Sequence, residues 1–104
     1  MIANQELNKK VRALTGETTP CDVNGNPNRD YAGDIQEAMA LADEILRCGY
    51  NIEIKITCRQ NDEYDYFAAA SFDGVRVAIG GDGYTVARSL CSLYLTWREH
   101  MGKQ

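Results

Sequence analysis

The chain has 104 residues, and its 15 acidic residues outnumber its 11 basic ones, which gives a formal net charge of −4. Hydrophobic residues at 44% and charged residues at 25% are typical of a globular chain, and the length predicts one domain over residues 1–104. The acidic balance argues against binding to duplex nucleic acid, which needs a basic surface, and no apolar run approaches the roughly 18 residues of a membrane span.

Two amphipathic helices are predicted in the first half of the chain. Apolar residues recur at helical spacing from Ala3 to Leu14 and predict a helix over residues 4–15. Residues 16–30 contain both prolines and many turn-forming residues, so they predict a long loop. A second helix is expected over residues 33–48, with Asp30 or Asp34 near its start and Gly49 as its stop. Its predicted apolar stripe comprises Ile35, Ala38, Met39, Ala42, Ile45 and Leu46.

Three strands are predicted where the period of the apolar residues changes from 3.6 to 2. Tyr50, Ile52, Ile54 and Ile56 alternate with polar residues and indicate a strand with one polar face. A polar turn over residues 59–63 leads to a second strand over 64–72, and Asp73-Gly74 is typical of a two-residue hairpin turn before a third strand over 75–79. Together these segments predict an antiparallel β-meander.

A third helix is expected from about residue 84 to Met101, ended by Gly102. Its apolar residues occupy two neighbouring stripes, and Arg88, Ser89, Ser92, Thr96 and Glu99 form the remaining polar side. A helix this apolar is either central in its domain or buried against a second subunit, and we favour a homo-oligomer formed through this helix. The element order predicts an α+β fold (α-α-β-β-β-α), a three-stranded meander with helices packed on it, on one face or on both.

Cysteine usage and the first residues bear on compartment and chemistry. The sequence of residues 1–6 lacks the basic and then apolar pattern of a signal peptide, so a cytoplasmic location is expected. Cys21, Cys48, Cys58 and Cys91 are widely spaced, and His100 is the single histidine. We therefore expect reduced thiols, no metal site, no cofactor and no catalytic residue, and we predict that the protein is not an enzyme.

Three stretches carry a family resemblance: residues 7–16, residues 31–38 and residues 81–91. They resemble the phage ABA-sandwich domain family, small phage proteins in which helices pack on both sides of a sheet. The chain departs from the family pattern at Ala32 and Gly33, where the family has Ser and Thr. By analogy, the resemblance implies an anti-defence protein, a sponge that binds a nucleotide second messenger such as a cyclic ADP-ribose isomer or a cyclic oligonucleotide without cleaving it.

The candidate site for this small nucleotide is the Gly-rich segment that leads into the third helix. Backbone N–H groups at such a position, together with the helix dipole, suit a phosphate. Exposed tyrosines at helix starts suit a stacked base, and arginines suit phosphates. The candidate ligand-binding residues are Gly81, Gly83, Tyr84, Thr85, Arg88, Tyr31 and Arg29.

Each of these features has a structural alternative. The Gly-rich segment is also typical of a plain connection between strand and helix that Thr85 caps. Tyrosines at helix starts are often packing residues, and single arginines are often solvated surface charges. Asp62, Glu63 and Asp65 indicate a solvated hairpin tip. The alternative function is a protein-binding inhibitor of a host defence effector, such as a CRISPR nuclease, that uses the acidic surface.

Overall fold

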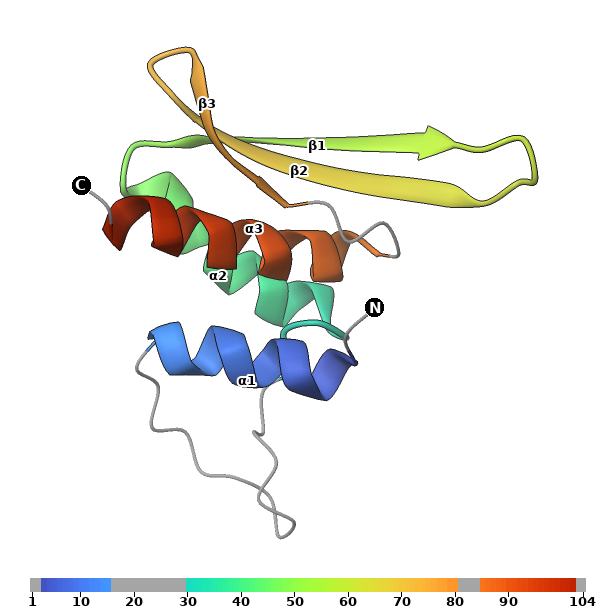
Figure 1. The fold of residues 1–104 in the computed structure, drawn as a ribbon, viewed down its shortest axis with the longest axis horizontal. Coiled ribbons are helices and arrows are strands. Elements are labelled where there is room, and N and C mark those ends of the chain that lie inside the picture. Colours follow the sequence, from blue (N-terminus) through green and yellow to red (C-terminus); the bar gives the residue numbers. More distant parts are fainter. Residues whose placement is uncertain (1–2, 16–29, 81–84, 103–104) are drawn as a thin grey trace, which may run out of the picture.

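Three helices lie on one side of a three-stranded sheet in the computed structural model, which describes residues 3–15, 30–80 and 85–102 (Figure 1). The antiparallel meander has the strand order β1-β2-β3 and confirms the predicted α+β fold. The elements in chain order are α1 (Asn4–Thr15), α2 (Ile35–Arg47), β1 (Asn51–Cys58), β2 (Tyr64–Phe72), β3 (Val75–Gly80) and α3 (Val86–Gly102).

The helices form two layers beneath one face of the sheet. Helix α3 packs on β2 and β3, α2 packs beside α3 and reaches β1, and α1 packs on α3 as the element furthest from the sheet (Figure 1). The described helices therefore cover one face of the sheet, whereas the family resemblance implies helices on both. The opposite face carries Glu53, Lys55 and Arg76, whose guanidinium carbon lies 5.3 Å from the centre of the Phe67 ring. This face also carries Ile79, but its charged residues suit solvent, and an antiparallel sheet can leave one face uncovered.

The sheet follows the predicted pairing closely. Strand β1 runs antiparallel to β2 with Ile54 opposite Ala68, and β2 pairs with β3 with Ala70 opposite Ala78. The turn residues Asp73 and Gly74 have φ angles of 53° and 80°, as a two-residue hairpin turn of type I′ requires. The pairing of β2 with β3 shifts register between Ala70 and Ser71, so a bulge interrupts this pair while β1–β2 stays regular.

Both ends of α2 are set by local chemistry. The helix begins two residues later than predicted, because Asp34 is its N-cap and its carboxylate accepts a hydrogen bond from the Gln36 N–H at 2.9 Å. Cys48 is its C-cap, and Gly49 follows with a φ angle of +92°. Gly49 is therefore the predicted stop, since the left-handed conformation favours glycine.

The core is built on a sheet face of small residues. Ala68, Ala70 and Ala78 are fully buried, and Gly80 continues this face at the end of β3. A Cβ atom on Gly80 would collide with the backbone of Leu93 and would lie 2.6 Å from the carbonyl oxygen of Ser89. Helix α3 therefore lies directly on the sheet. Gly80 is therefore explained by this close approach, which needs no ligand.

Helix α3 is central in the chain, and this position accounts for its two apolar stripes. Leu90, Leu93, Tyr94 and Trp97 are buried within the described core. Arg88 and Ser89, which were expected on the polar side, are also buried; the Ser89 hydroxyl donates to the Tyr66 carbonyl oxygen at 3.2 Å. The width of the apolar surface therefore gives no reason to place a second subunit on α3, and a contact through this helix remains a prediction.

None of the described helices combines the length and the apolar character needed to cross a bilayer. The longest, α3, has 17 residues and carries charged side chains along its length. Its apolar residues are buried against the sheet, α1 and α2.

Replacing Gly80 by alanine tests the close packing of α3 on β3. We expect Gly80→Ala to lower the free energy of unfolding by about 3 kcal/mol or more, because the added methyl group meets backbone atoms that cannot rotate away. Gly102→Ala is the matched control, since a Cβ there meets no atom within 4 Å. Urea unfolding followed by circular dichroism measures both. Equal midpoints for the two variants would contradict the packing described here.

Candidate functional site

The structure covers part of the predicted nucleotide site. Thr85, Arg88 and Tyr31 belong to the described chain. The remaining predicted residues lie outside the described ranges, and these are Arg29, Gly81, Gly83 and Tyr84. Three side chains of the predicted site can therefore be placed.

Thr85 and Arg88 form the first turn of α3. The Thr85 hydroxyl accepts a hydrogen bond from the Arg88 N–H at 3.0 Å, which is the geometry of an N-cap. The Arg88 side chain is not a solvated surface charge: the residue is 5% exposed, and its guanidinium donates to the side-chain oxygen of Asn4 in α1. Arg88 therefore links α3 to α1, and a phosphate would have to compete with this internal contact.

Tyr31 is 2% exposed, so its ring packs in the core instead of facing solvent. The backbone around it is fixed by Asn8 of α1, whose amide donates to the Asp30 carboxylate at 2.8 Å. The Asn8 side-chain oxygen accepts from the Ala32 N–H, also at 2.8 Å. The same Asp30 oxygen accepts from the Gly33 N–H at 3.0 Å. The burial fits the packing alternative for Tyr31, because stacking on a base needs an accessible ring.

Asn4 and Asn8 of α1 thus hold two of the predicted site residues, or the segments that carry them, against the same helix. They lie four residues apart and therefore on the same face of α1. Asn4 contacts Arg88, and Asn8 holds the segment that carries Tyr31. Asparagine at these positions lies off the apolar stripe of α1 and is typical of a helix surface. The signal that the sequence lacked was burial: Asn8 is a buried polar residue with both of its amide groups bonded.

A second polar cluster connects α2 with α3. The Arg98 guanidinium donates to the Tyr94 hydroxyl at 3.0 Å and lies 3.5 Å from the Glu44 carboxylate. Burial raises the pKa of the Tyr94 hydroxyl, and the hydrogen bond and negative charge of Glu44 raise this pKa further. The phenol therefore stays protonated at neutral pH. It acts as a structural hydrogen-bonding group between the helices and is poorly suited to be a general base.

Other clusters in the described chain offer little chemistry. No three His, Cys, Asp or Glu side chains of the described residues lie together as metal ligands would. At the tip between β1 and β2, Arg59 forms an ion pair with Asp65 at 2.6 Å, and both side chains are partly exposed. Cys48, Cys58 and Cys91 form no disulfide, and of these three only Cys91 is buried.

An open hollow of about 390 Å³ lies beside the last turns of α1 and α3. Its lining includes Trp97, whose buried indole N–H has no hydrogen-bond partner in the described structure. The one charged group of its described lining, Arg98, already pairs with Glu44. The hollow therefore presents an apolar wall with few groups that could recognise a specific small molecule. Its described lining is Leu14, Trp97, Arg98, Met101 and Gly102.

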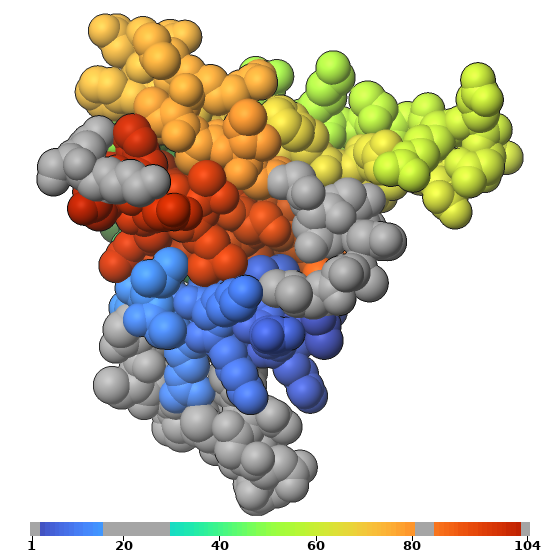
Figure 2. Space-filling model, viewed as in Figure 1, coloured from blue at the N-terminus to red at the C-terminus, as the bar shows by residue number. Residues whose placement is uncertain are grey.

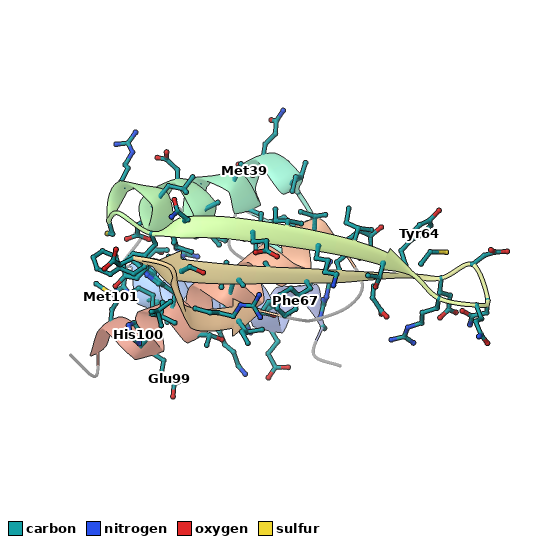
Figure 3. All side chains as sticks on the ribbon, turned by 90° about the horizontal axis from the view of Figure 1, so that it is seen from above. Met39, Tyr64, Phe67, Glu99, His100 and Met101 are labelled. Carbon is teal, nitrogen blue, oxygen red and sulfur yellow. The ribbon has the colours of Figure 1, made fainter. Side chains whose placement is uncertain are left out.

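The most distinctive surface belongs to the β1–β2 hairpin, which projects beyond the helices (Figures 1 and 2). On its helix side, Ile54, Ile56 and Tyr64 are 42%, 54% and 56% exposed. We call these three residues the ribbon surface. They share the face of the buried Ala68, because opposite residues of an antiparallel pair point to the same side. Figure 3 shows Tyr64 toward the free end of the hairpin, far from His100 and Met101. An apolar core face thus continues into solvent.

Helix α2 carries a second exposed apolar surface. Ile35, Met39 and Leu46 are exposed, although they lie on the predicted apolar stripe, and we call them the α2 stripe. The helix buries Ala38, Ala42 and Ile45 of that stripe together with Leu41. Seen from above, α2 and Met39 lie on the outer side of β1 (Figure 3). Two exposed apolar surfaces therefore flank the free edge of β1.

Comparison with known proteins gave no match among protein-family models, curated proteins or solved structures. The resemblance to the phage ABA-sandwich family therefore remains a prediction. The functional interpretation depends on the geometry of this chain alone.

Removing the Asn8 side chain tests its role in holding the segment that carries Tyr31. We expect Asn8→Ala to lower the free energy of unfolding by about 2 kcal/mol, because the buried Ala32 N–H loses its acceptor. Gln5→Ala, on the exposed side of α1, is the control and should change the stability by less than about 0.5 kcal/mol. Thermal or urea unfolding measures both. A stable Asn8→Ala variant would show that the packing of Tyr31 does not depend on this network.

Proposed function

We propose that this protein acts by binding another protein through the ribbon surface. The observation that carries the proposal is the exposure of Ile54, Ile56 and Tyr64 on one face of a projecting hairpin. Isolated exposed apolar residues are common, but a continuous apolar face beside a free strand edge is typical of a protein–protein contact. The proposal is a general form of the protein-binding alternative that the sequence left open.

The backbone supports this function as well as the side chains. Strand β1 is an edge strand, and all of its residues except Ile52 are exposed. Its outer N–H and C=O groups can pair with a strand of a partner, while the ribbon surface provides apolar burial. The described cysteines form no disulfide, which favours a reducing compartment, so we place this binding in the cytoplasm.

Binding of a nucleotide messenger is a second candidate function. One observation favours it: Arg88 lies in the first turn of α3, so a cation and the positive end of the helix dipole coincide. Anti-defence activity, phage origin and sequestration without cleavage belong to this candidate, and they derive from the family resemblance alone.

Capture experiments with ribbon variants test protein binding. Tagged and untagged copies are produced together in the same cells, and proteins retained by the tag are quantified by mass spectrometry. We expect Ile56→Glu to retain about fivefold less of at least one protein than the wild type, because a charge replaces an apolar side chain that the partner would cover. Val75→Glu, the same change at an exposed site of β3, is the control. Equal retention by all three proteins, with unchanged circular dichroism, would contradict the proposed function.

Calorimetry tests the second candidate. If α3 forms a phosphate site, cyclic oligonucleotides or ADP-ribose isomers should bind the wild type with a dissociation constant in the micromolar range. Arg88→Lys keeps the positive charge but loses the planar guanidinium, so it should bind more weakly. No heat of binding across the panel at high protein concentration would exclude this candidate and leave protein binding unaffected.

A further inference from the structure

The free edge of β1 is well suited to pair with another strand. The strand has eight residues in regular register with β2, and the described chain places no strand on its other side. The opposite edge, β3, is shorter, and a bulge interrupts its pairing with β2. Bulges and short strands protect sheet edges from further pairing, and β1 has neither protection.

The sequence of β1 is complementary to itself when it runs antiparallel. With Ile54 at the centre, Ile52 lies opposite Ile56 of the second strand, and Asn51 lies opposite Thr57. The same register places Glu53 opposite Lys55 twice, once on each side of the centre. A shift of one residue in the centre, to Glu53 or Lys55, places like charges directly opposite each other, which destabilises a strand pair. The charges therefore favour the register centred on Ile54 over its two neighbours.

The two charges are available for such pairing. Glu53 and Lys55 are exposed, and neither forms an ion pair with another residue of the described chain. They lie on the polar face of the sheet, away from the helices. Every apolar residue of β1 would meet an apolar residue of the second strand on the helix side. Both faces of the pairing thus match in chemistry.

A two-fold axis through Ile54 also brings the two exposed apolar surfaces together. Helix α2 lies beneath the first half of β1, whereas the second half projects beyond the helices (Figure 1). In the antiparallel pair, the first half of one β1 lies beside the second half of the other. The α2 stripe of each copy is therefore placed next to the ribbon surface of its partner. Each copy covers the surface that the other leaves exposed, as a two-fold interface requires.

From these observations we infer that the partner bound at this edge is a second copy of the chain. The two β1 strands pair antiparallel around Ile54 and join the two meanders into one six-stranded sheet with the helices of both copies on one side. Glu53 and Lys55 favour this register over its neighbours, and the ribbon surface and the α2 stripe provide the apolar contact. The inference rests on the proposed function, because it names the protein that the ribbon surface binds.

Charge exchange in β1 tests this register. We expect the wild type to be a dimer by sedimentation equilibrium. Glu53→Lys and Lys55→Glu should each raise the dissociation constant of the dimer about tenfold or more, because two opposite-charge pairs become like-charge pairs. The double variant Glu53→Lys/Lys55→Glu restores both opposite-charge pairs and should return to near the wild-type constant. High salt should reduce the differences between the variants.

Controls separate this register from effects of net charge. Glu6→Lys and Lys9→Glu make the same charge changes at exposed positions of α1 and should leave the dimer unchanged. Circular dichroism shows whether each variant is folded. A monomeric wild type at 100 times the protein concentration of the capture experiment, or a double variant as weak as the single ones, would overturn the inference.

A cross-link gives a second and independent measurement. With Cys21, Cys48 and Cys58 replaced by serine, Ile54→Cys should form a disulfide between copies on oxidation, because residue 54 lies opposite itself. Thr57→Cys in the same background should not, since it lies opposite Asn51. Cross-linking of both variants to the same extent, or of neither, would overturn the register. The capture experiment can also show that Ile56→Glu reduces binding of a protein other than this chain while the wild type is monomeric. In that case this inference fails and the proposed function stands.

Discussion

The direct contact of α3 with the small-residue face of β2 and β3 determines the position of the other elements. Ala68, Ala70 and Ala78 leave room for the helix backbone, and Gly80 lets Leu93 approach where any side chain would collide. Because α3 lies so close to the sheet, it occupies the centre of the core and separates the sheet from α1. Helix α2 then has its place beside α3, under β1.

This arrangement leaves the larger apolar residues of the hairpin without a cover from the same chain. Beyond Ala68 the hairpin pairs Ile56 with Tyr66 and Cys58 with Tyr64. The free end of this hairpin projects beyond the helices (Figure 1). A sheet that carried its bulky residues above α3 would instead hold the helix further away. The distribution of side-chain size along β1 and β2 thus sets both the tight core and the exposed surface that we propose for binding.

Local signals in the sequence were sufficient for most of the fold. The Asp73-Gly74 turn, the stop at Gly49 and the alternation in β1 each depend on a few neighbouring residues, and the structure confirms them. Tertiary placement was less accessible. Arg88 and Asn8 read as polar surface residues because their partners lie 84 and 22 or more positions away in sequence. Met39 was expected in the core, although it is exposed. Helical spacing shows which residues share a side of the helix, but it does not show how wide the buried part of that side is. The prediction of the site was the least accurate. Tyr31 and Arg88 were expected to be exposed because of their residue types alone, and both are buried.

The position of Trp97 gives the molecule a built-in optical reporter. It is the single tryptophan of the chain, it is buried, and its ring lies 5.7 Å from that of Tyr50 and 6.0 Å from that of Tyr94. These three rings come from α3 and from the residue that precedes β1. Excitation of the tyrosines should therefore be transferred to an indole held in an apolar environment. Separation of α3 from the sheet should shift its emission to longer wavelength, so that folding can be followed without an added dye.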